Sequence, residues 1–116
     1  MTDSRSVASH FDGKSPTVQA VYARVLEVVR LLGTIEEDPK KTSIHLVRSS
    51  ALAGVETRKG YLLLNLKTPY PIRSPRAVKA EQLSAHRYHT KVKLTSPTEV
   101  DEELAGWLKD AYDISG

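Results

Sequence analysis

The segment Arg87–Leu94 carries the side chains with the clearest capacity for chemistry. Every second residue in it is basic: Arg87, His89, Lys91 and Lys93. The residues between them suit a buried face: Tyr88, Thr90, Val92 and Leu94. Because successive side chains of a strand point to opposite faces, this pattern predicts a row of basic groups about 7 Å apart. Such a row suits phosphate, which Arg binds in bidentate fashion and Lys binds as a point charge.

The basic residues of the whole chain are concentrated around this row. Twelve of the 17 Lys and Arg residues lie between positions 40 and 97, where Glu56 and Glu81 are the only acids. The segments on both sides are net acidic. A strongly cationic segment indicates either an anionic partner or an acidic surface within the same molecule. The alternative is a solvated sheet face whose charges provide solubility and protect an edge strand.

Residue types for catalysis or metal binding are present, but their spacing is unfavourable. His86 and His89 form an H-x-x-H pair with no carboxylate or Cys nearby in sequence, so we predict no metal site. Ser84 lies close to His86 and Glu81, yet three neighbours on one loop do not make a catalytic triad. We therefore predict no catalytic residues and no cofactor. The absence of Cys excludes disulfides and thiolate sites.

Length and hydropathy indicate one small domain. A chain of 116 residues corresponds to a single core. No apolar run approaches the ~20 residues of a membrane span, and the N-terminus lacks a signal-peptide core. We therefore predict a cytoplasmic protein that does not contact membranes. Residues 1–10 are expected to be a disordered tail, and residues 11–114 a single domain.

Three Ser-Pro pairs mark expected helix starts, at residues 15–16, 74–75 and 96–97. The first opens an apolar stripe over Pro16–Leu32, which ends at Gly33. The last belongs to a capping box, Ser96 to Glu99, that leads into an acidic helix over residues 98–113.

Between these helices the apolar pattern has a period of two. The expected strands are Ser43–Val47, Ala51–Thr57, Tyr61–Lys67, Arg87–Leu94 and a short Thr34–Glu37. Gly60 is expected to adopt a positive φ in the turn after Arg58 and Lys59. The segment Thr68–Ala80 contains three prolines and is expected to cross over and end in a short helix, Pro75–Gln82. The sequence thus predicts an α+β fold, an antiparallel sheet of four to five strands with both terminal helices on one face.

Several segments, taken in order, resemble a known family. They are His10–Pro16, Lys41–Ile44, Ala53–Lys59, Pro75-Arg76, Glu81–Leu83, His89, Lys93–Pro97, Asp101–Leu104, Trp107-Leu108 and Ala111-Tyr112. Over about His10 to Tyr112 the chain resembles the bacterial domain-of-unknown-function 5655 family. The resemblance implies a small α+β domain, alone or appended to other domains, without an established activity. It also implies polar positions of interest at Lys41, Thr42, Arg58, Lys59, Arg76 and His89. Leu46 stands where the family often has an aromatic residue.

The element order is also similar to that of frataxin, in which iron binding depends on an acidic first helix. Here Pro16–Leu32 has Glu27 as its only acid, so we do not expect iron binding.

We predict a non-enzymatic binding module for an anionic partner: nucleic-acid backbone, a phosphorylated ligand or an acidic protein. The expected contact residues are Lys41, Thr42, Arg58, Lys59, Arg76, His89, Lys91 and Lys93. Few aromatic residues are available to stack bases, which argues against base-specific binding. The alternative is a small enzyme with a pocket around His89, Lys41 and Arg76. A third hypothesis is self-association, with the basic sheet of one copy meeting the acidic helix 98–113 of another.

Overall fold

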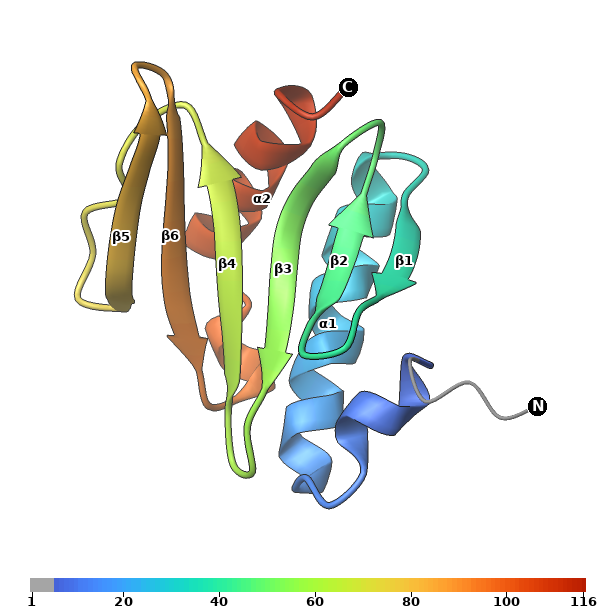
Figure 1. The fold of residues 1–116 in the computed structure, drawn as a ribbon. Coiled ribbons are helices and arrows are strands. Elements are labelled where there is room, and N and C mark those ends of the chain that lie inside the picture. Colours follow the sequence, from blue (N-terminus) through green and yellow to red (C-terminus); the bar gives the residue numbers. More distant parts are fainter. Residues whose placement is uncertain (1–5) are drawn as a thin grey trace.

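A computed structural model describes residues 6–116 as one antiparallel six-stranded sheet with two α-helices packed on the same face (Figure 1). The strands are β1 (Glu36–Pro39), β2 (Ile44–Val47), β3 (Ala51–Thr57), β4 (Leu62–Thr68), β5 (Ala77–Ser84) and β6 (Arg87–Leu94). The helices are α1 (Pro16–Leu32) and α2 (Glu102–Asp113), with short 3-10 turns η1 (Ala8–Phe11) and η2 (Pro97–Glu99). The strand order is β1-β2-β3-β4-β6-β5. The predicted α+β class and the placement of both helices are confirmed.

The core lies between the helices and the sheet. Helix α1 contributes a buried stripe at helical spacing: Val18, Val21, Tyr22, Val25, Leu26 and Val29. Leu62, Leu64 and Leu66 of β4 are fully buried, and so are Val92 and Leu94 of β6. The alternation predicted for these two strands is therefore confirmed, and their odd-numbered residues face away from the helices.

The C-terminal helical region differs from the prediction in one detail. The capping box forms as predicted, because Glu99 Oε1 accepts a hydrogen bond from the Ser96 amide (3.1 Å) while Ser96 Oγ accepts from the Thr98 amide (3.3 Å). It caps the 3-10 turn η2, and the buried, non-helical Val100 separates that turn from α2. Asp101 provides the cap of α2 by accepting from the Leu104 amide (3.0 Å).

Strand β5 corrects the prediction of a short helix over Pro75–Gln82. The segment pairs antiparallel with β6 and forms an edge of the sheet, so the sheet has six strands and not four or five. Its residues are mostly good helix formers, but pairing with a long neighbouring strand overrides that weak local preference. Accordingly Ser74 begins no helix, and its Oγ accepts a hydrogen bond from the Arg76 amide (3.2 Å).

Two turns also differ from expectation. Among the described residues, positive φ occurs at Gly13 and Gly33 and not at Gly60. The β3–β4 turn is closed instead by a hydrogen bond from the Arg58 amide to the Tyr61 carbonyl (2.9 Å).

The end of the expected N-terminal tail overlaps a short turn of the described structure. Residues 1–5 of the expected tail lie outside the described part, but η1 begins at Ala8. The carbonyl of His10 accepts from Thr57 Oγ1 (2.6 Å), and His10 Nε2 lies 2.8 Å from the Lys40 carbonyl. These contacts tie η1 to β3 and to the β1–β2 turn. No helix in the described residues is long and apolar enough to span a membrane.

Candidate anion-binding site

The sheet face opposite the helices, which we call the open face, carries polar side chains aligned across neighbouring strands. Backbone pairing places five residues in one row: His45, Gly54, Asn65, Lys91 and Lys79, on β2, β3, β4, β6 and β5. The row therefore crosses most of the sheet at right angles to its strands.

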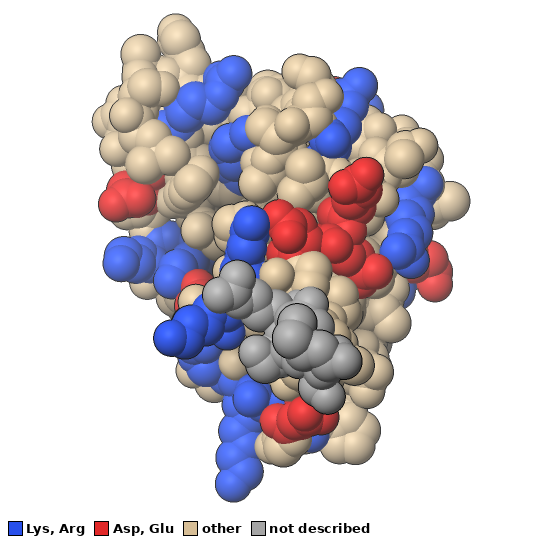
Figure 2. Space-filling model, turned by 45° about the vertical axis from the view of Figure 1, so that its right-hand side comes forward, with Lys and Arg blue, Asp and Glu red and all other residues tan. Residues whose placement is uncertain are grey.

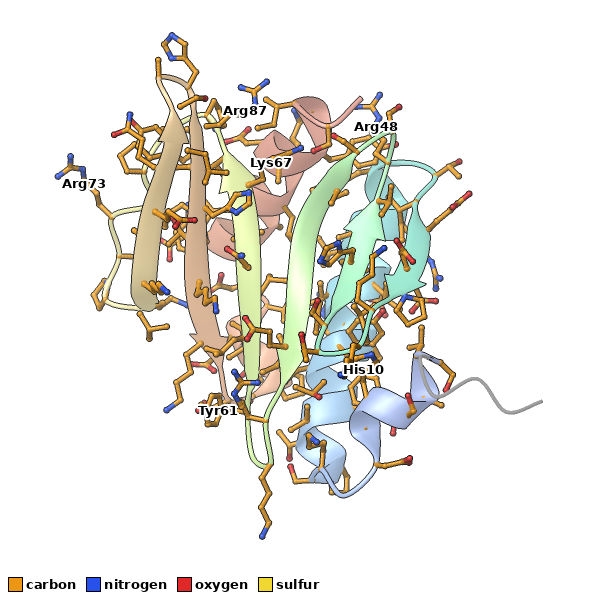
Figure 3. All side chains as sticks on the ribbon, viewed as in Figure 1. His10, Arg48, Tyr61, Lys67, Arg73 and Arg87 are labelled. Carbon is orange, nitrogen blue, oxygen red and sulfur yellow. The ribbon has the colours of Figure 1, made fainter. Side chains whose placement is uncertain are left out.

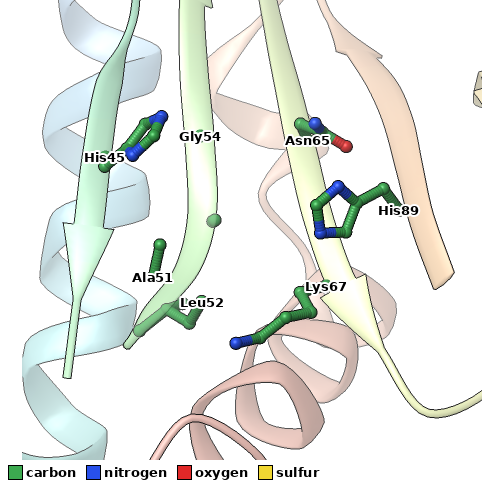
Figure 4. Close-up of a pocket in the computed structure, with 8 residues that line it drawn as sticks. His45, Ala51, Leu52, Gly54, Asn65, Lys67 and His89 are labelled. Atoms are coloured by element: carbon green, nitrogen blue, oxygen red, sulfur yellow. The ribbon is translucent and has the colours of Figure 1, made fainter. Parts of the chain in front are cut away.

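A hollow forms in this row because Gly54 has no side chain. The hollow has a volume of about 80 Å³, and His45, Asn65, Lys67 and His89 line it together with the Gly54 backbone (Figure 4). His45 and His89 come from opposite sides, and Asn65 lies between them (Figure 4). Two further hollows, of about 190 and 250 Å³, are also lined by Asn65. The three hollows share lining residues, and we call them together the groove.

Asn65 supplies an unsatisfied polar atom to this groove. Its Oδ1 is buried and has no hydrogen-bond partner among the described residues. A buried amide oxygen without a donor is costly, by roughly 1–3 kcal/mol. A ligand that donated a hydrogen bond here would recover that cost.

Lys67 and His89 give the hollow its electrostatic character. Lys67 Nζ donates to Ser50 Oγ (3.0 Å), and burial, assisted by the nearby charge of Arg87, lowers the pKa of Lys67. Figure 3 shows Lys67 and Arg87 near each other at one end of the sheet. Burial also lowers the pKa of His89, with Lys67 acting in the same direction and Glu81 opposing it. No ion pair is formed by Lys67, Arg87 or His89 among the described residues. A bound anion would raise the pKa values of Lys67 and His89 towards their ordinary values.

Lys91 and Arg58 lie on the same face, but both form ion pairs with Glu56. Lys91 Nζ lies 2.8 Å from Glu56 Oε2, and an Arg58 guanidinium nitrogen lies 3.0 Å from Glu56 Oε1. Hydrogen bonds from Lys91 and then Arg58 lower the pKa of the Glu56 carboxyl. For these two predicted contact residues, the acidic partner lies within the same molecule.

Arg76 is held at the start of α2, away from the open face. Its guanidinium lies 3.1 Å from Asp101 and 3.4 Å from Glu103, donates to the Glu99 carbonyl, and stacks 5.8 Å from the centre of the Trp107 ring. The side chain is only 18% exposed. Arg76 therefore fastens the crossing segment to α2, and the structure does not bring it together with His89 and Lys41.

The remaining predicted residues are dispersed. Thr42 lines the largest hollow, next to Ser43 and His45. Lys41 is exposed in the β1–β2 turn and Lys59 in the β3–β4 turn. Lys93 is exposed, with its Nζ 4.5 Å from the centre of the Tyr61 ring. In Figure 3, Tyr61 lies at the end of the sheet opposite Lys67, and Arg73 points away from the body of the molecule.

Of the eight predicted contact residues, the groove contains Thr42, His89 and Lys91. The predicted set missed His45, Gly54, Asn65 and Lys67, and it also missed Lys79, Glu56 and Glu81, which line the groove as well. A glycine in mid-strand was the available signal, because such a residue weakens a strand and often marks a place that a ligand approaches.

Apart from Glu56 and Glu81, which line the groove, most acidic side chains lie elsewhere. Figure 2 brings the β1 side forward and shows Asp and Glu gathered near the middle of that view, with Lys and Arg around them. Strand β1 itself has the sequence Glu36-Glu37-Asp38-Pro39. Within residues 6–116, no group of three or more His, Asp or Glu side chains is arranged to hold a metal ion.

Comparison with known proteins identifies the family. The family model described as Domain of unknown function (DUF5655) matches residues 7–115, and the chain belongs to this family. No curated protein and no solved structure shows significant similarity to the chain.

Proposed function

We propose that this member of the DUF5655 family is a binding module whose open face takes an anionic partner, and that a phosphate group of the partner occupies the hollow at Gly54. The observation that carries the proposal is that Lys67 and His89 lie together beside that hollow, partly buried and without an ion pair in the described residues, although Glu81 lies opposite His89 in the sheet.

The chemistry of the lining suits phosphate. Lys67 supplies a point charge, and His89 donates a charged hydrogen bond once protonated. The buried side-chain oxygen of Asn65 accepts no hydrogen bond from the described residues. The hydroxyl group of a singly protonated phosphate can donate that hydrogen bond. Hydrogen bonds to charged groups contribute about 1.5–3 kcal/mol each, so two or three of them support specific binding.

The rest of the open face fits a phosphate that belongs to a larger molecule. Lys79 lines the neighbouring hollow and Lys93 is exposed further along β6, so these two residues extend the cationic surface beyond the hollow at Gly54. Nucleic-acid backbone and phosphorylated metabolites share the chemistry that this site recognises, and the probes below separate them.

The test is a binding comparison with two kinds of probe. Labelled single-stranded and duplex DNA are titrated by fluorescence anisotropy at low and physiological salt, and inorganic phosphate is titrated by NMR of the His45 and His89 rings. We expect phosphate to shift both rings, and DNA affinity to fall with increasing salt if backbone phosphates are the ligands.

Two variants connect binding to the hollow. Lys67→Met should weaken binding roughly 10-fold or more, the equivalent of one charge-assisted hydrogen bond. Gly54→Ala places a methyl group in the hollow at ordinary contact distances, 3.7 Å from the His45 ring and 3.9 Å from Asn65 Cβ, so the fold should persist while binding weakens. Lys109→Met, on the exposed side of α2, removes the same charge far from the hollow and is the matched control. Absence of binding to every probe at low salt, or binding unchanged in both hollow variants, would contradict the proposal.

A further inference from the structure

The edge strand β5 has the features of a surface that pairs with another strand. It is unpaired on one side, and seven of its eight residues are exposed. Three large apolar side chains are exposed in the described chain, and two of them, Val78 and Leu83, lie on β5, at 56% and 52% exposure. The helices do not cover this strand, which forms the left edge of the sheet in Figure 1. An exposed edge of this kind is a template for strand addition.

The two edges of the sheet differ in their capacity to pair with themselves. At the other edge, β1 carries Glu36, Glu37 and Asp38 and ends in Pro39. Antiparallel pairing of two β1 strands would place acids opposite acids and would lack the amide hydrogen of the proline. Strand β1 is therefore protected against self-pairing, whereas β5 carries charges of both signs.

The charges on β5 are self-complementary. When two β5 strands pair antiparallel about Ala80, Lys79 of each copy lies opposite Glu81 of the other. Within its own chain Lys79 lies opposite Lys91, a like charge, and Glu81 lies opposite His89, but neither Lys79 nor Glu81 belongs to an ion pair in the described residues. The regular stretch of β5 between its two register shifts runs from Lys79 to Gln82, and pairing centred on Ala80 aligns Gln82 with the exposed Val78 of the second copy.

We propose that the occupant of the β5 edge is a second copy of this chain, joined through β5 in an antiparallel pair centred on Ala80. The result is a continuous sheet, formed by the six strands of each copy and related by a two-fold axis perpendicular to it. Both pairs of helices then lie on one side, and both open faces lie on the other.

This arrangement has a consequence for binding that rests on the proposed function. His89 of one copy and Lys91 of the other lie in the same cross-strand row, three strand spacings or about 14 Å apart. A long polyanion could therefore contact both hollows at once, which raises its apparent affinity without any new type of contact.

The test measures association without ligand, so its outcome is independent of anion binding. Sedimentation velocity of the full chain over a range of concentrations should show a monomer–dimer equilibrium. K79E would place a glutamate opposite Glu81 of the second copy at two symmetric positions and should weaken the dimer roughly 10-fold or more. The double variant K79E/E81K restores opposite charges at both positions and should restore the dimer.

Controls separate this interface from the alternatives. K79E places a glutamate opposite Lys91 of its own chain, an attractive pair, so the β5–β6 amides should keep their hydrogen-exchange protection. Lys59→Glu changes the net charge equally in the exposed β3–β4 turn, away from β5, and should leave the dimer intact. A monomer at every concentration would overturn the proposal. A dimer unaffected by K79E would also overturn it and would favour contact between the basic sheet and the acidic helix region.

Discussion

The two faces of the sheet are built from the same strands, and on β4 they can be compared residue by residue. Leu64 is fully buried beneath the helices, whereas its neighbour Asn65 lies on the open face with a buried oxygen that no described group satisfies. On the covered face, the side chains of the helices and the sheet pack against each other. The open face keeps Lys67, which forms no ion pair among the described residues, and an unused hydrogen-bond acceptor. The two faces therefore differ in the polar groups that they leave without a partner.

The largest expected difference between the faces concerns stability. Leu64→Ala removes a fully buried side chain and should lower the free energy of unfolding by about 2–5 kcal/mol. Leu63→Ala, one residue away on the half-buried open face, is the matched control and should cost less. Urea denaturation of both variants measures the difference. Equal losses would mean that the open face is itself part of a packed core.

A second prediction concerns the cations that Glu56 neutralises. Glu56→Gln removes the carboxylate that holds Lys91 and Arg58, so binding of a labelled anionic probe should strengthen several-fold and depend more steeply on salt. Glu56→Gln should also lower the free energy of unfolding by about 1 kcal/mol. Glu102→Gln, in the first turn of α2, makes the same change of net charge away from the open face and serves as the control. Equal effects of both variants would show that only net charge matters.

The third prediction treats Gly54 as the origin of the hollow. A glycine inside a strand costs roughly 0.5–1 kcal/mol relative to alanine, and a Cβ at this position meets nothing closer than 3.7 Å. Gly54→Ala should therefore raise the free energy of unfolding by that amount while weakening phosphate binding. Denaturation and NMR titration of the same sample measure the two effects. A loss of stability would show that the space is needed for packing and not for a ligand.

The smallest expected effect is a pH dependence that originates at His89. Burial lowers its pKa in the folded protein below the ordinary value of 6.5, so the unfolded chain binds more protons between the two values. Stability should consequently rise with pH through that interval and fall as pH drops below 6.5. His89→Gln should remove this contribution to the slope of the free energy of unfolding against pH. In the unmutated protein, addition of phosphate should raise the pKa of the His89 ring, which NMR can follow. A slope unchanged in His89→Gln would assign the effect to another group.

The sequence predicts the parts of this fold that leave a periodic pattern. The apolar stripe of α1, the capping box at Ser96 and the alternation of β6 all follow from spacing and propensity, and each is present. Strand β5 has no such pattern, because both of its faces are exposed and no alternation is required. Only its pairing with β6 reveals it as a strand, and that contact is not visible in local sequence.

For the candidate site, too, the sequence predicts local patterns but not contacts between distant residues. Alternation correctly placed His89 and Lys91 on one face, but it could not show that Glu56 neutralises Lys91. Arg76 lies 25 residues before Asp101, and the fold alone brings them together. Asn65 and Gly54 carry no charge, so an argument from charge passed over the two residues that shape the hollow.

The position of β6 in the sheet has a consequence for how the molecule assembles. β6 follows β5 in the chain but lies between β4 and β5. Because a turn of only two residues joins β5 to β6, these strands can pair as a hairpin, but β4 keeps an open edge until Arg87–Leu94 docks on it. Closure of the long connection between β4 and the hairpin must precede the contacts that stabilise it, which slows folding. A chain arrested at that point would expose the Leu62, Leu64 and Leu66 edge, so that intermediate is the species most prone to aggregate.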